Sequence, residues 1–169
     1  MNEITRFIRK TPKAELHIHI EGTLEPELMF KLAKRNNIEI PYKNINGVKS
    51  AYNFSNLESF LNIFYQGSNV LIKEQDFFDL TWAYTLKCKE NNIVHSEIFF
   101  DPQTHTNRGI DFEVVINGIY KALVKANKEF GLTSKIIMCF LRHLDEASAF
   151  KILDQALVHK NKIIAVGLD

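Results

Sequence analysis

Residues 11–26 read TPKAELHIHIEGTLEP, from Thr11 to Pro26, and the rest of the chain can be understood from this stretch outward. Polar and apolar residues alternate along it, which is typical of a β-strand over residues 14–20. Such a strand has two faces, and the alternation predicts one with Leu16, Ile18 and Ile20 and an opposite one with Glu15, His17 and His19. A turn at Gly22-Thr23 and a helix beginning at Pro26 are expected to follow.

The two histidines are spaced for a shared ligand. A rise of roughly 3.3 Å per residue places the Cα atoms of His17 and His19 about 6.6 Å apart, so both imidazoles can reach one metal ion at about 2.0–2.1 Å. The same alternation is also typical of a strand with one solvated face, and the pattern alone leaves both interpretations open. The position favours the metal, because α/β folds build their sites at the carboxyl ends of strands.

Composition indicates a globular protein and excludes several partner classes. The chain has 169 residues, 46% of them hydrophobic, and a net charge of +1 from 21 basic and 20 acidic residues. The sequence has no basic stripe of the kind that binds nucleic acid, so we expect no nucleic-acid partner. No apolar run reaches membrane-spanning length, and residues 1–10 lack a signal-peptide segment. We therefore expect a cytoplasmic protein without membrane contact. Cys88 and Cys139 form no Cys-x-x-Cys pair, so a bound zinc ion would have nitrogen and oxygen ligands.

Hydrophobic patterns and capping residues predict alternating strands and helices. Further strands are expected over residues 93–100, 135–141 and 163–169, and helices over 26–36, from Ser55, over 74–91, from Asp111 to Gly131 and over 145–160. Residues 1–10 are expected to form a short helix or arm, and residues 38–53 and 101–103 to be loops. This order specifies a parallel α/β architecture.

Two closures of the sheet are compatible with this order of elements. An open doubly wound sheet loses support because no strand is followed by a Gly-x-Gly-x-x-Gly or Walker loop. A TIM (β/α)8 barrel would need eight strands and about 250 residues, so these four strands would form about half of one. The last strand ends at Asp169 without a covering helix, which suggests a fragment of a longer protein.

Several segments together carry a family resemblance. The chain resembles the N-terminal half of the adenosine/adenine deaminase family, metal-dependent amidohydrolase barrels, and is most similar to the adenine deaminase branch. The matching segments are PKAELHIHIEGTLEPELMF at 12–30, the region around 52–54, SEIFFDPQTH at 96–105, IIMCFLRH at 136–143 and IIAVGLD at 163–169.

The resemblance implies a domain organisation, a cofactor and an activity. Residues 1–169 would be the incomplete N-terminal half of one barrel domain, with His17 and His19 as two ligands of a single catalytic zinc. The activity implied is hydrolytic deamination of adenine to hypoxanthine and ammonia, in purine salvage. The remaining ligands and the general acid would lie beyond Asp169, so no catalytic residue is assigned to this half, and we expect the isolated piece to be inactive and to hold zinc weakly or not at all.

Glu21 is the expected substrate-binding residue. Adenosine deaminases usually carry Asp at this position, where it meets the ribose, and the longer side chain would help to fill the ribose space and favour the free base. One alternative is an adenosine deaminase. Another, from a different class, is a non-catalytic half-barrel that associates with itself or a partner; a homo-oligomer is possible in any case, and the ligand is expected to be a small purine.

The other polar residues have structural interpretations at this stage. Glu97 is expected in a structural ion pair, while Arg142 fits either the rim of the site or a surface pair. The apolar residues that follow at helical spacing are expected to pack in the core rather than to form a wall over a purine; they are Phe54, Leu57, Phe60, Leu61 and Phe64. Three further histidines are expected to be structural or at the surface, namely His95, His143 and His159.

Overall fold

Four parallel strands form the centre of the protein, whose computed structural model describes residues 2–169 apart from the side chain at position 58. The strands pair in chain order and are β1 (Lys13–His19), β2 (Ile93–Phe100), β3 (Thr133–Phe140) and β4 (Ile163–Leu168). Because each connection between these strands contains helix, the sheet consists of parallel βα units. The parallel α/β class predicted from the sequence is confirmed.

Eight helices and one short 3-10 turn surround the sheet in the described part of the chain. They are α1 (Glu3–Lys10), the 3-10 turn η1 (Ile20–Thr23), α2 (Pro26–Asn36), α3 (Ile45–Ala51), α4 (Leu57–Ser68), α5 (Glu74–Glu90), α6 (Pro102–Thr106), α7 (Phe112–Phe130) and α8 (Glu146–Leu157). The bounds expected for α2 match the structure, and Gly131 ends α7 in the left-handed region at φ 75° as expected.

Three of the expected boundaries are wrong. The segment expected to be a loop over 38–53 contains α3, because the side chain of Asn44 accepts a hydrogen bond from the amide of Gly47 and caps a short helix. Helix α4 is capped by Asn56 rather than by Ser55, in a reciprocal pair with Ser59. The segment expected to be a loop at 101–103 leads into α6, which begins at Pro102.

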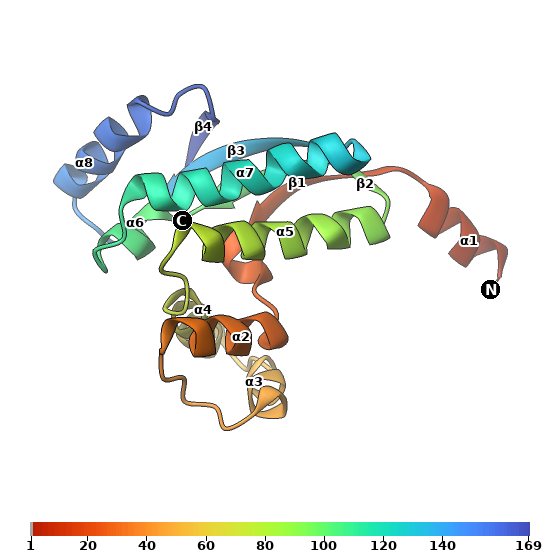
Figure 1. The fold of residues 1–169 in the computed structure, drawn as a ribbon, viewed down its shortest axis with the longest axis horizontal. Coiled ribbons are helices and arrows are strands. Elements are labelled where there is room, and N and C mark those ends of the chain that lie inside the picture. Colours follow the sequence, from red (N-terminus) through yellow and green to blue (C-terminus); the bar gives the residue numbers. More distant parts are fainter. Residues whose placement is uncertain (1) are drawn as a thin grey trace.

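Helices α5 and α7 lie side by side over one face of the sheet (Figure 1). The two helices approach closely at Gly118 of α7: a Cβ atom there would lie 2.6 Å from the Cβ atom of Phe77 and would also meet the carbonyl oxygen of Glu74. The core between these helices and the sheet includes the fully buried Phe77, Ile98 and Phe100. The carboxyl ends of the strands are thereby held in fixed positions.

A bulge in β1 changes which side chains share a face. Glu15 pairs with Ser96 and Ile18 pairs with Ile98, so two residues of β1 lie opposite the one residue of β2 between these pairs. Ser96 and Ile98 are fully buried on the helix-covered face, and Glu15 therefore also faces the helices, where its Oε2 atom accepts a hydrogen bond of 2.6 Å from the hydroxyl of Tyr84. The simple alternation expected for this strand is wrong at Glu15.

The bulge also takes Leu16 out of the core. Its side chain is 59% exposed, whereas Ile20 is fully buried and Ile18 packs against the core. The expectation that Leu16, Ile18 and Ile20 share one buried face is therefore wrong for Leu16. His17 and His19 keep the common orientation that the sequence predicts, because the extra residue lies before Ile18.

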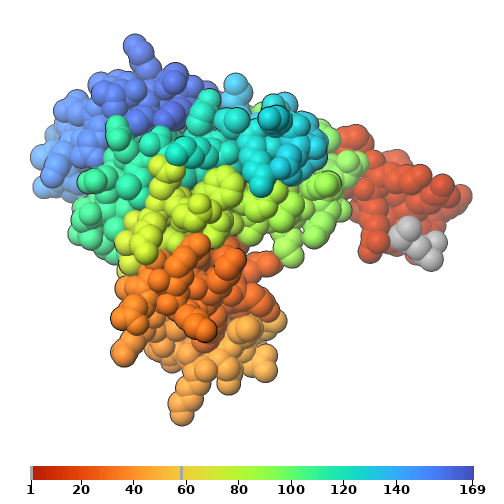
Figure 2. All heavy atoms as spheres, in the orientation of Figure 1, coloured from red at the N-terminus to blue at the C-terminus, as the bar shows by residue number. Residues whose placement is uncertain are grey.

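Some parts of the molecule stand away from this body. Figure 2 shows α1 projecting at one end of the sheet and the segment of α2 and α3 projecting below it. Helix α1 buries no residue. Within residues 2–169, no helix combines the length and the apolar character that a membrane crossing requires.

Candidate active site

The imidazoles of His17 and His19 converge at the carboxyl end of β1. Their Nε2 atoms are 3.4 Å apart. Both rings stack on Phe99 of the neighbouring strand, with ring centroids 4.2 Å and 5.3 Å away, and this aromatic surface fixes their planes. The pairing predicted from the sequence is present, although β1 ends at His19 and the following Ile20 already belongs to η1.

Two aspartates join this pair, and each directly follows a strand. Asp101 comes after β2 and is fully buried, with its Oδ1 atom 3.6 Å from His19 Nδ1. Asp169 comes after β4, and its Oδ1 atom lies 3.9 Å from His19 Nε2. The carboxylate of Asp101 raises the pKa of His19 against the opposing effect of burial. Burial, together with the charge of Glu21, raises the pKa of Asp101 to about 7.

These residues fit a zinc ion. Two nitrogens at about 2.1 Å from zinc and at a tetrahedral angle lie about 3.4 Å apart, which is the separation of the two Nε2 atoms. Asp101 faces the other nitrogen of His19, and a carboxylate in that position orients a zinc-bound histidine. Neither oxygen of Asp101 has a hydrogen-bond partner among the described residues, so a cation would balance a buried carboxylate. Cys139 lies nearby and is buried, with its potential donor atom within 4.8 Å of donor atoms of His19 and Asp101.

Glu21 is buried in a polar network behind the histidines. Its exposed fraction is 4%, and its Oε1 atom accepts hydrogen bonds from the amide of Asp101 at 3.1 Å and from His105 Nε2 at 3.0 Å. The second oxygen, Oε2, is buried and has no partner within the described part of the chain. Glu21 therefore offers one unused acceptor beside the candidate metal site.

An aromatic wall stands beside this site. The wall consists of Phe54, Phe60, Phe64 and Tyr65, whose rings contact one another in sequence with centroids 5.2 Å to 6.0 Å apart. A Cβ atom at Gly22 would lie 4.0 Å from the ring of Phe64, so the wall lies next to the segment that carries Glu21. Burial and the charges of Asp169 and Asp101 raise the pKa of Tyr65. Core packing as the general explanation is wrong here, since Phe54 is 40%, Phe60 37% and Leu57 70% exposed; Leu61 and Phe64 are partly buried.

The other polar residues have local structural contacts, with His95 and Glu97 close to each other on β2. His95 Nδ1 lies 2.7 Å from the hydroxyl of Thr133, and its Nε2 lies 3.7 Å from Glu97 Oε1. Arg142 donates to the backbone oxygen of Asp169 and so lies at the rim. His143 is exposed, and His159 faces Glu113 at 3.8 Å.

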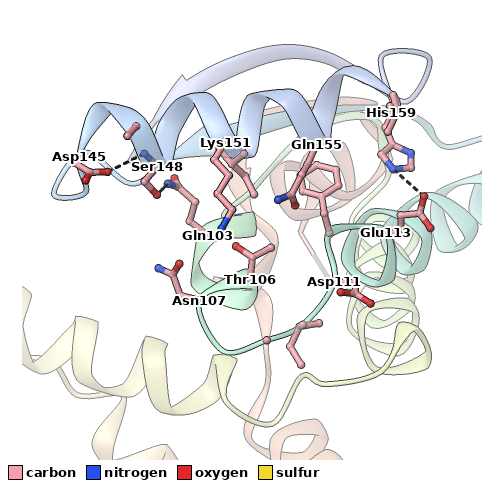
Figure 3. A pocket seen from close by; sticks show the side chains of 16 residues that line it. Gln103, Thr106, Asn107, Asp111, Glu113, Asp145, Ser148, Lys151, Gln155 and His159 are labelled. Atoms are coloured by element: carbon pink, nitrogen blue, oxygen red, sulfur yellow. Dashed lines mark hydrogen bonds and ion pairs between the residues drawn. The ribbon is translucent and has the colours of Figure 1, made fainter.

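A separate groove lies away from the histidine site. It has a volume of about 790 Å3 and runs between α6, the start of α7 and α8 (Figure 3). Its lining side chains include Gln103, Asp145, Lys151 and His159. The side chain of Gln103 donates a hydrogen bond to the hydroxyl of Ser148 and accepts one from the amide of Leu141, both at 2.8 Å. Gln103 thus connects α6 to α8 and to the end of β3. The groove lacks the paired metal donors of the histidine site, and we place no chemistry there.

Sequence reasoning missed Asp169 and His105 as members of the site, and for Asp101 it preferred a place in a loop to one that lines the mouth of the site. A usable signal existed for the two aspartates, because Asp101 directly follows the strand predicted over 93–100 and Asp169 is the last residue of the strand predicted over 163–169. Parallel strands bring such positions to one edge. His105 had no such signal, since it lies on α6, which the pattern does not reveal.

The family model for adenosine deaminase matches residues 12–169. The chain belongs to the adenosine deaminase family. The match begins immediately before β1 and includes all four strands, both histidines and both aspartates.

Individual members of the family are highly similar to this chain. An adenine deaminase of Psychrobacter cryohalolentis is 64% identical over 163 residues, which are 96% of this chain and 49% of that protein. The crystal structure of adenine deaminase from Arthrobacter aurescens superposes with a TM-score of 0.89 at 46% identity, covering 94% of this chain and 48% of that one. An amidohydrolase of Burkhoderia ambifaria with bound Zn shares the fold, with a TM-score of 0.85 at 22% identity over 97% of this chain and 45% of that one.

The chain spans about half the length of the curated relatives it matches. Its four parallel strands and their helices correspond to about half of the solved adenine deaminase. The fold is therefore half of a TIM (β/α)8 barrel, as the resemblance implied.

Proposed function

We propose that the whole protein to which this chain contributes catalyses the hydrolytic deamination of adenine to hypoxanthine and ammonia. The observation that supports this most is the pair of convergent Nε2 atoms, 3.4 Å apart, at the carboxyl end of β1. The high identity to proteins named adenine deaminase supports the choice of substrate. In this proposal residues 1–169 are the N-terminal half of one barrel domain, in the cytoplasm.

A single zinc ion is the proposed cofactor, held here by His17 and His19. Asp101 orients His19 from the opposite side of its ring, and Asp169 adds a carboxylate at the mouth. When bound, such an ion lowers the pKa of a water ligand to about 7 and so supplies hydroxide at neutral pH. The further ligands and the general acid are proposed to lie in the other half of the barrel.

Glu21 and the aromatic wall are the proposed contacts for the purine. The exposed rings of Phe54 and Phe60 provide an apolar surface for a flat heterocycle. Glu21 Oε2 is buried and lacks a donor within residues 2–169, so a purine N–H that reaches it would satisfy an otherwise unpaired acceptor. Free adenine has an N–H where a nucleoside carries its ribose, so this acceptor favours the free base.

The test is an assay of both substrates with the full native polypeptide. We expect turnover of adenine with a kcat/KM well above that for adenosine. A clear preference for adenosine would instead support the adenosine deaminase alternative. Absence of turnover of either, in a folded protein containing zinc, would contradict both.

The non-catalytic alternative has a separate observation in its favour. Strand β4 exposes Ile164, Val166 and Leu168 at 55%, 54% and 66%, and no other described element covers them. An exposed apolar edge strand promotes association. A stable self-assembled form of this chain as the native product, without any deaminase activity in cells, would support it.

A further inference from the structure

His105 has a geometry that fixes where its proton lies. The ring is fully buried on α6, with Nδ1 2.9 Å from Arg108 Nη2 and Nε2 3.0 Å from Glu21 Oε1. A guanidinium can only donate hydrogen bonds, so Nδ1 must be the unprotonated acceptor. The ring hydrogen is therefore on Nε2, which donates it to Glu21.

Arg108 is itself held in place. Its Nη2 atom lies 3.0 Å from the backbone oxygens of both Ser68 and Leu71, so its two hydrogens are shared between these oxygens and His105 Nδ1. Its Nε atom donates to the backbone oxygen of Thr104 at 3.1 Å. These contacts join α6 to the end of α4, the helix that carries most of the aromatic wall. Arg108 therefore keeps His105 in one orientation relative to that wall.

Glu21 is held at one oxygen only. Oε1 receives two hydrogen bonds, from His105 and from the amide of Asp101, whereas Oε2 receives none from the described residues. A carboxylate with one oxygen fixed by two donors has a defined orientation for the other. The direction of the free acceptor therefore depends on the N–H of His105.

We propose that His105, oriented by Arg108, is a positioning residue that aims Glu21 Oε2 at the substrate. The inference rests on the proposed function, which assigns the purine N–H as the donor to that oxygen. His105 does not touch the substrate or the metal donors; it acts through Glu21. Its loss should weaken substrate binding without removing zinc.

A matched pair of substitutions in the full native polypeptide tests this. His105→Gln keeps an N–H donor at a reach similar to Nε2, whereas His105→Asn is too short to reach Glu21. We expect His105→Asn to raise the KM for adenine about tenfold, the effect of losing one hydrogen bond to a charged group, with kcat changed far less. His105→Gln should stay within roughly threefold of the wild type. Zinc content should be unchanged in both.

His95→Asn is the control, because His95 contacts Thr133 and Glu97 and not Glu21. Equal KM values for His105→Asn and His105→Gln would overturn the proposal. If His105→Asn does not fold, His105→Phe replaces it, since it keeps the ring beside Phe77 and lacks the N–H. A similar rise in KM is expected, and an unchanged KM would overturn the proposal.

If the proposed function is wrong, the wild-type polypeptide itself will not turn over adenine, and this outcome is distinct from a failure of the inference about His105. In that case crystal structures of the wild type and of His105→Asn decide the positioning role directly. We expect the Glu21 carboxylate to turn away from its wild-type orientation in the variant. An unmoved carboxylate would overturn the inference whatever the substrate.

Discussion

Glu21 is buried, its Oε1 atom accepts two hydrogen bonds, and its Oε2 atom has no donor among the described residues. The length of the side chain therefore determines where Oε2 lies. Aspartate at this position is one methylene shorter, so its carboxylate cannot keep both the contact to His105 and the position of Oε2. The side chain is 4% exposed, and no solvent would replace the lost bonds.

We therefore predict that Glu21→Asp lowers the preference for adenine over adenosine. The ratio of the two kcat/KM values should fall by about tenfold or more, since shape and hydrogen bonding both change at the ribose position. Glu97→Asp is the matched control, because Glu97 pairs only with His95 among the described residues. An unchanged ratio in Glu21→Asp would mean that this carboxylate does not discriminate between the two substrates.

The residues of the site differ in how far the sequence reveals them. His17 and His19 were predictable because their spacing and the strand position of the pair are both local properties of the sequence. Asp101, Asp169 and His105 come together through strand pairing and through α6, and these depend on contacts between distant segments. Local periodicity contains no information about such contacts.

At the scale of elements, β1 shows why alternation alone is an incomplete guide. The bulge between Glu15 and Ile18 turns Glu15 to the helices and leaves Leu16 exposed. The hydroxyl of Tyr84 on α5 holds Glu15 there. The helices that cover the sheet were largely predictable from their apolar stripes. The bulge was not, because it depends on tertiary contacts that the local hydrophobic pattern does not show.

We predict that Tyr84→Phe destabilises the protein by about 1–3 kcal/mol, because it leaves the partly buried Glu15 without its donor. Chemical denaturation of the full native polypeptide measures this. Tyr120→Phe, at a site 37% exposed, should change stability by less than about 0.5 kcal/mol. Equal effects of the two substitutions would show that the Tyr84 bond does not stabilise the bulge.

The close contact of α5 and α7 gives a second prediction at this scale. Gly118→Ala places a Cβ atom against Glu74 and Phe77, so the helices must separate. We expect a loss of about 1–3 kcal/mol despite the higher helix propensity of alanine. Gly47→Ala in α3, with its nearest neighbour at 3.8 Å, should be neutral or slightly stabilising in the same denaturation experiment. A neutral Gly118→Ala would contradict the close approach.

At the scale of the whole molecule, the described half-barrel exposes surfaces that a full barrel would bury. The apolar side chains of β4 are more than half exposed at Ile164, Val166 and Leu168. The relatives are about twice as long as this chain, so we expect the rest of a complete barrel to cover this edge. The sequence could predict the open edge but not the surface that covers it.

We predict that residues 1–169 alone neither turn over adenine nor hold stoichiometric zinc, and that they self-associate through β4. Two histidines leave a tetrahedral site incomplete, and an apolar edge strand without cover pairs with another copy. Sedimentation at high micromolar concentration should show oligomers, and Val166→Lys should shift them toward monomer. A monomeric chain with full adenine turnover would contradict this view.

We propose that His17 and His19 hold a metal ion which the deamination of adenine requires. The most direct measurement is adenine turnover by the full native polypeptide before chelation, after chelation and after return of zinc, alongside the double substitution of His17 and His19 by alanine. We expect turnover to disappear on chelation and to return with zinc. In the double variant we expect neither turnover nor bound metal. Full turnover by the chelated protein or by the double variant would contradict it.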